Sequence, residues 1–68
     1  MFNYSKLLGR IREQGYTQEQ LAKEIGKSEV TLGAKLKGRG YFNAEEMDSI
    51  CRVLDIPTES IGAYFFAR

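Results

Sequence analysis

The apolar residues of the first segment recur at the spacing of one helical face. Four of them stand at positions i, i+3, i+4 and i+7, namely Tyr4, Leu7, Leu8 and Ile11. This period is typical of an amphipathic helix. Asn3 is a suitable N-cap, and Gly15 supplies the left-handed stop that helix ends favour. Residues 4–14 are therefore predicted to form a first helix.

A second helix is predicted from its capping signals. Thr17 and Gln20 have the spacing of a capping box, in which each side chain bonds the backbone N–H of the other residue. The apolar residues of this segment are Leu21, Ala22 and Ile25. Gly26 then ends the helix, because it adopts a left-handed turn without steric cost.

A third helix is predicted almost immediately afterwards. Ser28 is a capping residue, and residues 29–37 follow it up to Gly38. So short a junction forces the second and third helices to cross at a steep angle. We therefore predict a helix-turn-helix over about residues 18–37.

The rest of the chain predicts two more helices. Asn43 and Glu46 form another capping box. The apolar residues expected to build the core from this part of the chain are Met47, Ile50, Cys51, Val53, Leu54 and Ile56. Pro57 ends the fourth helix, and Thr58 can cap a short fifth one that reaches about Phe65. With no strand pattern of useful length, residues 1–68 are predicted to form one compact, all-α, five-helix domain.

Composition narrows the classes of function. With 68 residues, 43% of them hydrophobic and 28% charged, the chain has the composition of an ordinary small globular domain. It has one cysteine and no histidine, so the sequence offers almost no material for a zinc site, an internal disulfide or histidine-based catalysis. We expect no enzyme activity, cofactor, metal or small-molecule substrate. No membrane span or signal peptide is evident, so we expect a cytoplasmic protein.

The positions of the charged residues indicate more about binding partners than the net charge of +1 does. Residues 27–39 contain four basic side chains and one acidic one, Glu29, whereas residues 41–63 contain five acids and only Arg52. The basic region coincides with the third helix and the loop after it. This coincidence favours phosphate contacts there, with a merely solvated basic face as the alternative.

The run from Thr17 to Leu32 resembles the helix-turn-helix core of Cro and cI-type phage repressors and their xenobiotic-response-element-like bacterial relatives. The matched residues are Gln18, Leu21, Ala22, Gly26, Ser28, Leu32 and Gly38. Both terminal segments also look like a small group of temperate-phage regulators, which includes Cro-like repressors and modulator-of-repression antirepressors. The resemblance covers nearly the whole chain. It implies a lambda-repressor-like fold and a location in a bacterial host cell, in association with the nucleoid.

The resemblance also implies a mode of DNA binding, in which helix 29–37 enters the major groove. The residues then placed against base edges are Ser28, Glu29, Val30, Thr31, Gly33 and Ala34. Those expected at phosphates are Gln18, Lys27, Lys35, Lys37 and Arg39. None of the first set is an arginine or glutamine, the residues that discriminate bases most strongly. Gln18 could instead only cap its helix, and Gly33 and Ala34 could reflect tight packing without DNA.

Three consecutive aromatic residues near the end of the chain cannot all face one core. Tyr64, Phe65 and Phe66 therefore predict a protein interface, with core packing of at least one ring as the alternative. Tyr41 and Phe42 could join either the core or that surface.

Two functions remain. The first is a phage transcriptional regulator that binds operator half-sites as a homodimer on double-stranded DNA, in a lysis/lysogeny-type switch. The alternative is an antirepressor that binds a partner phage repressor protein and has weak or no DNA binding of its own. The sequence favours the first function, because the resemblance and the basic region around the third helix both point to DNA. The weak base-reading side chains and the small net charge are the features that favour the alternative.

Overall fold

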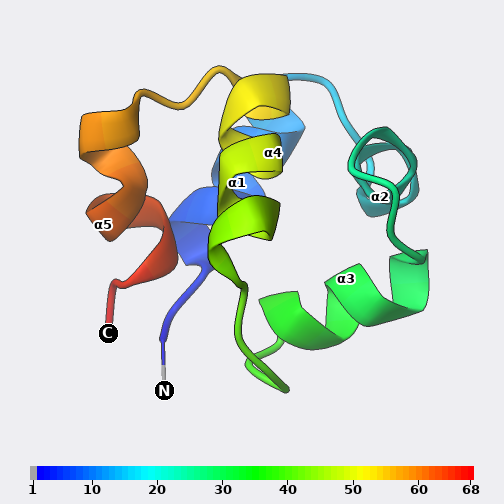
Figure 1. Cartoon of the computed structure of the whole chain (residues 1–68), viewed down its shortest axis with the longest axis horizontal. Coiled ribbons are helices and arrows are strands. Elements are labelled where there is room, and N and C mark those ends of the chain that lie inside the picture. The colour runs from blue at the N-terminus through cyan, green and yellow to red at the C-terminus, as the bar shows by residue number, and fades with distance from the viewer. Residues whose placement is uncertain (1) are drawn as a thin grey trace.

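The computed structural model describes residues 2–68 and contains five α-helices and one short 3₁₀ helix. The elements are α1 (Ser5–Glu13), α2 (Gln18–Glu24), α3 (Glu29–Leu36), α4 (Ala44–Leu54), η1 (Thr58–Ser60) and α5 (Ile61–Phe65). Residues 2–68 contain no strand. The predicted all-α, five-helix architecture is therefore confirmed (Figure 1).

Local capping signals set most of the helix starts. Both predicted capping boxes are present, at Thr17 with Gln20 and at Asn43 with Glu46. The Ser28 hydroxyl accepts the backbone N–H of Thr31 at 3.1 Å, as a cap of α3 should. These bonds satisfy backbone N–H groups that have no partner within a helix. Each bond therefore favours a helix start at that residue.

The first and last predicted caps fare differently. The N-cap position of α1 is Tyr4, one residue after the predicted Asn3, but Tyr4 makes no side-chain capping bond and the Asn3 side chain accepts the Ser5 N–H at 2.8 Å. Asn3 therefore supplies a capping bond at this end of α1, as predicted. Thr58 does not cap α5. It opens the 3₁₀ turn η1, which carries no side-chain cap, and α5 starts only at Ile61.

The core lies between α1, α4 and α5 and extends to α2 and α3. Its buried residues are Tyr4, Leu7, Ile11, Leu21, Ala22, Leu32, Leu36, Phe42, Ile50, Cys51, Leu54, Ile56 and Phe65. The rings of Tyr4, Phe42 and Phe65 meet edge to face, with centroid distances of 5.3 and 5.5 Å. Met47 and Val53 are only half-buried at its margin. The Cys51 thiol is buried as expected, and this burial together with the nearby charge of Asp48 raises its pKa.

The helices divide into two groups around α4. On one side α5 packs against α1 and α4, and on the other α2 packs against α3 and α4 (Figure 1). The two chain ends lie close together beside α5, where the Asn3 N–H bonds the carbonyl of Ala67 at 2.6 Å. Within residues 2–68 no helix has the length and apolar character needed to cross a membrane.

Candidate functional site

The predicted helix-turn-helix segment corresponds to α2, the connection 25–28 and α3. The connection turns at Gly26, whose φ of +72° suits glycine, and the Lys27 N–H then bonds the carbonyl of Ala22 at 2.9 Å. Ala22 and Leu32 are buried. A small residue at Ala22 fits the close packing of α3 on α2.

The first turn of α3 is the most exposed part of this segment. Ser28, Glu29, Val30 and Thr31 are all exposed, and Val30 is 83% exposed. The Ser28 hydroxyl donates to that of Thr31 at 2.8 Å, so these two polar groups are partly engaged with each other. The surface thus presents one apolar side chain, one carboxylate and two hydroxyls. We call residues 28–31 the α3 tip.

Gly33 and Ala34, the other predicted base-reading residues, lie one helical turn after Glu29 and Val30 and are half-buried. A Cβ on Gly33 would lie 3.3 Å from Oε1 of Gln18, so this glycine accommodates the α2 side chain. The Ala34 carbonyl accepts the N–H groups of Lys37 and Arg39 at 3.2 and 2.9 Å. Both positions have a packing or turn role that needs no DNA, which is the alternative raised from the sequence.

The predicted phosphate residues also fall into an exposed group and a half-buried group. Lys27, Lys37 and Arg39 are exposed at the two ends of α3, whereas Gln18 is half-buried against Gly33. Lys35 differs from the other basic residues. Its side chain is 21% exposed, and its ammonium group is bound to Glu46. A phosphate at Lys35 would have to compete with this carboxylate, and the assignment of Lys35 to phosphate stays a prediction.

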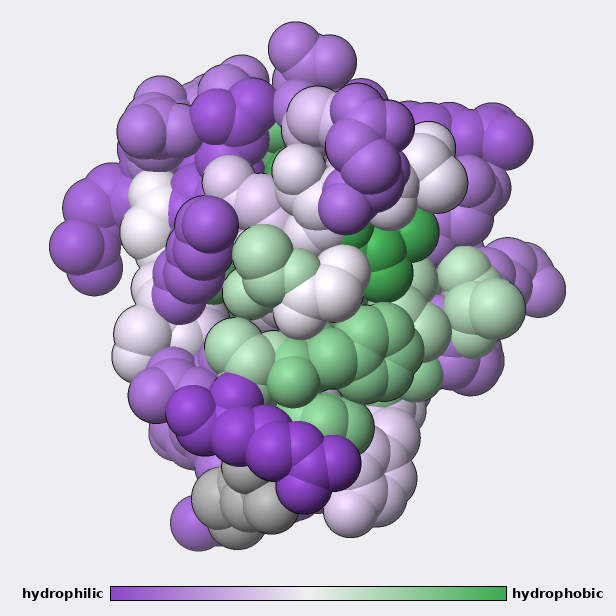
Figure 2. Space-filling model, turned by 90° about the vertical axis from the view of Figure 1, so that its left-hand side faces the viewer, coloured by the Kyte–Doolittle hydropathy of each residue, from purple (hydrophilic) through white to green (hydrophobic). Residues whose placement is uncertain are grey.

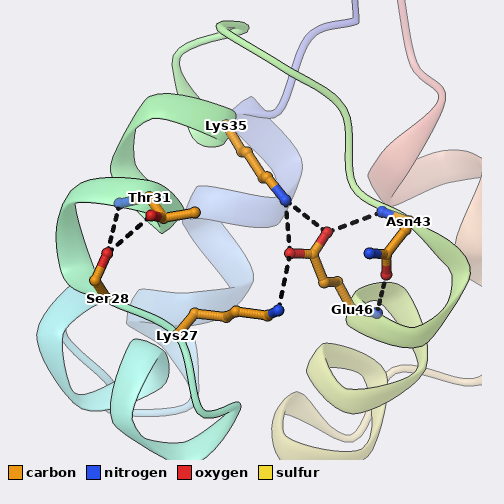
Figure 3. A network of polar contacts seen from close by, with 6 residues as sticks. All are labelled: Lys27, Ser28, Thr31, Lys35, Asn43 and Glu46. Carbon is orange, nitrogen blue, oxygen red and sulfur yellow. Dashed lines mark hydrogen bonds and ion pairs between the residues drawn. The ribbon is translucent and has the colours of Figure 1, made fainter.

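Glu46 is the centre of a polar network that joins α3 to α4 (Figure 3). The Lys35 ammonium donates to both carboxylate oxygens at 2.8 and 2.6 Å, and the Asn43 N–H donates to one of them at 2.9 Å. Lys27 Nζ lies 3.9 Å from the same carboxylate. Burial by itself raises the pKa of Glu46, but the bonds from Lys35 and Asn43 and the charges of Lys35 and Lys27 outweigh it and lower the pKa.

Arg10 has a structural role that the sequence analysis missed. Its guanidinium donates to the carbonyls of Leu54 and Asp55 at 3.0 and 2.9 Å, at the end of α4, and to Glu13 at 2.6 Å. A basic side chain at the carboxyl end of a helix satisfies its last carbonyls. No local signal points to this contact, because its partners lie 44 and 45 residues away in the chain.

The C-terminal aromatic residues are not one surface. Phe65 is 1% exposed and packs on Phe42, so its assignment to a protein interface is wrong, and core packing, the alternative raised above, holds for this ring. Tyr64 is half-buried with the Lys6 ammonium 5.0 Å from its ring centroid. Phe66 is 46% exposed. It meets Phe2 edge to face at 5.4 Å, and Figure 2 shows an apolar area bordered by hydrophilic residues on this side of the molecule.

The two loop residues that the sequence assigned to neither the core nor the surface, Tyr41 and Phe42, also differ in position. Phe42 is in the core, whereas Tyr41 is 73% exposed and stands 6.0 Å from the Phe2 ring. Phe2 itself was absent from the predicted interface. Its apolar character was the only signal for it, and the contact depends on the two ends of the chain meeting.

Among residues 2–68, no three His, Cys, Asp or Glu side chains are grouped as metal ligands. The polar groups of the α3 tip are exposed and their partners are local.

Comparison with known proteins agrees with the fold. The solution structure of the modulator of repression (MOR) of the temperate bacteriophage TP901-1 from Lactococcus lactis superposes with a TM-score of 0.81 and 35% sequence identity. The match covers 96% of this chain and 88% of that chain. No curated protein matches the sequence. A family described as "Protein of unknown function (DUF739)" matches residues 1–68. The chain therefore belongs to the DUF739 family and is similar over nearly its whole length to a phage modulator of repression.

Proposed function

We propose that this protein is a phage antirepressor, which binds a repressor protein and thereby modulates repression. The observation that carries the proposal is the similarity to the TP901-1 modulator of repression, at 35% identity over 96% of this chain. At the α3 tip, Val30 is 83% exposed and offers an apolar anchor that a protein partner can bury. The antirepressor, which was the alternative function in the sequence analysis, is thus preferred here to the DNA-binding regulator.

The chemistry of the α3 tip supports a protein partner over DNA. Residues 28–34 contain no arginine, lysine, asparagine or glutamine, so no bidentate contact to a base edge can be made from them. Glu29 is the only charged residue of this set, and its carboxylate can only accept a hydrogen bond, as from a cytosine amino group. Lys35 adds no free charge, because Glu46 neutralises it.

The similarity to the TP901-1 protein supports the same function. At 35% identity over 96% of this chain, the likeness extends beyond the fold alone. That protein is described as a modulator of repression, which is the class of activity proposed here. The partner in our proposal is the phage repressor encoded in the same genome as this chain.

The test combines co-purification with a DNA-release assay. The chain and the repressor are co-expressed, and the purified chain is then added to the repressor bound to its operator. We expect a stable complex and loss of the repressor from DNA. Val30→Asp should weaken the complex by about tenfold or more, since an anchor residue typically contributes at least that much.

The matched control is Ala63→Asp, which places the same charge at an exposed position of α5. It should leave the complex unchanged, and both variants should keep the helical circular dichroism spectrum of the parent. The proposal fails if the parent neither co-purifies with the repressor nor displaces it from the operator. Equal weakening by the two variants would instead contradict the role of Val30.

Operator binding by the chain itself is the second candidate, and the exposure of Lys27, Lys37 and Arg39 around α3 favours it. In that case purified protein should retain particular duplexes from a random pool, with affinity that falls steeply between about 50 and 200 mM salt. Lys37→Ala should then weaken binding to every sequence and flatten the salt slope. A homodimer on DNA belongs to this candidate.

A further inference from the structure

An aromatic hollow is lined by residues from both chain ends and from the loop before α4. The two chain ends lie on the opposite side of the molecule from the start of α3 (Figure 1). The hollow has a volume of about 230 Å³. Three rings form its rim, Phe2, Tyr41 and Phe66, and its remaining lining residues are Tyr4, Phe42, Met47 and Phe65. We call this feature the terminal aromatic groove. A smaller hollow of about 110 Å³ continues it past Gly38 and Gly40.

The rim rings are held by contacts with one another and with buried residues beneath them. Phe2 meets Tyr41 at 6.0 Å and Phe66 at 5.4 Å, both edge to face, while three of the residues beneath are buried in the core. Even so, Tyr41 and Phe66 remain 73% and 46% exposed. The structure thus leaves two large rings in water around a preformed cavity, an arrangement typical of a recognition site.

The lining favours an apolar occupant. Apart from backbone groups, the phenol oxygens of Tyr4 and Tyr41 are its only strongly polar atoms. A water molecule there finds few partners, and a well-bound water needs two to four. With a volume of about 230 Å³, the hollow has room for an apolar side chain.

The charges around the groove are positive. The Arg68 guanidinium lies 5.3 Å from the centroid of the Phe2 ring. Lys37 and Arg39 are exposed on either side of Gly38, which lines the continuation of the groove. Three acids lie close to the lining residue Met47 in the sequence. Glu46 is paired with Lys35 and Asp48 with Arg52. Glu45 lines a different hollow beside Lys27. A segment that carries carboxylates on both sides of its apolar residue would therefore meet complementary charge.

We infer that the terminal aromatic groove binds a large apolar side chain presented by an acidic segment of a protein partner. This is a second docking surface, separate from the α3 tip that the proposed function uses. It allows the protein to hold two partners, or two parts of one partner, on different sides.

The inference is tested by titrating the ¹⁵N-labelled full chain with three blocked peptides. The first is acetyl-Glu-Asp-Phe-Asp-Glu-amide, the second replaces its phenylalanine by alanine, and the third replaces its acids by lysines. With the first peptide we expect saturable shifts of the amides of Phe2, Tyr41 and Phe66 at up to about 5 mM, enough to fill most of a site with a Kd near 1 mM. The other two peptides should bind about tenfold more weakly.

Two variants separate the surfaces. Tyr41→Ala removes an exposed rim ring and should weaken the first peptide about tenfold, whereas Val30→Asp should leave its affinity unchanged. The inference is overturned if no saturable shift occurs, if the three peptides bind alike, or if shifts map to α3. Concentration-dependent shifts at the rim without any peptide would also overturn it, since a second copy would then be the occupant. None of these results bears on repressor binding through Val30.

Discussion

The Lys35 ammonium group on α3 holds both carboxylate oxygens of Glu46 on α4, at 2.8 and 2.6 Å. Glu46 is also the residue whose side chain bonds the backbone N–H of Asn43 to start α4. A single carboxylate therefore caps one helix and fixes the position of another. Since the α3 tip depends on how α3 is held, this pair connects stability to the proposed binding surface.

Replacement of Glu46 by glutamine should lower the free energy of unfolding by about 1–3 kcal/mol. The amide oxygen can still accept the Asn43 N–H, but the half-buried Lys35 loses its counter-charge. Urea unfolding measures the loss. Asp48→Asn is the matched control, because it breaks an exposed ion pair with Arg52 and should cost less than about 0.5 kcal/mol. Equal losses in the two variants would show that the Lys35 pair contributes no more than a surface contact.

The stability of the parent should depend on pH through the same carboxylate. The pKa of Glu46 is lowered in the folded protein from its ordinary value of 4.5, so the folded state binds the proton less readily than the unfolded state. This contribution is complete above the ordinary value and is lost as the pH falls through the folded pKa. The difference in unfolding free energy between the parent and Glu46→Gln should therefore shrink on acidification below about pH 5. A constant difference at all pH values would contradict the lowered pKa.

Thr17→Ala should cost about 1 kcal/mol, whereas Thr58→Ala should change stability by less than about 0.5 kcal/mol. The Thr17 hydroxyl accepts the Gln20 N–H at 3.1 Å, while no side-chain cap is present at η1. Both threonines are exposed, so the comparison isolates the cap. The denaturation midpoints of the two variants provide the measurement, and a reversed order would mean that α5 relies on Thr58 after all.

Gly9→Ala should stabilise the protein by about 0.5–1 kcal/mol, and Gly33→Ala should stabilise it less. A methyl group at Gly9 meets nothing within 4 Å, whereas one at Gly33 lies 3.3 Å from the end of the Gln18 side chain. Gln18 can move, so the contact reduces the gain in helix propensity without a large clash. Thermal unfolding of both variants tests the difference. A strongly destabilised Gly33→Ala protein would show that Gln18 is fixed in its position.

The helix starts could be predicted because their signals are local. Thr17 with Gln20 and Asn43 with Glu46 are each three residues apart, and Ser28 bonds the N–H three residues on. Such bonds form whenever the helix forms, whatever surrounds it. The Thr58 cap failed because a 3₁₀ turn after Pro57 precedes α5, so that this helix begins only at Ile61.

The parts of the candidate site that depend on distant contacts could not be predicted. Lys35 reads as one more basic residue near the third helix until Glu46, eleven residues later, is placed beside it. Likewise, nothing local decides which of Phe65 and Phe66 turns inward, because the answer depends on Phe42 and Phe2. The exposure of Val30, in contrast, follows from the same helical period that buries Leu32 and Leu36, because a residue two positions before Leu32 points to the opposite face of the helix.

The buried thiol of Cys51 can serve as a built-in probe of local unfolding of the core. Cys51 is the single cysteine of the chain, and in the folded state it is both covered and poorly ionised. A thiol reagent can therefore react only when α4 separates from its neighbours. The labelling rate of the unmodified protein then reports how often the core opens, and the rate with and without repressor would show whether binding at a distant face keeps that core closed.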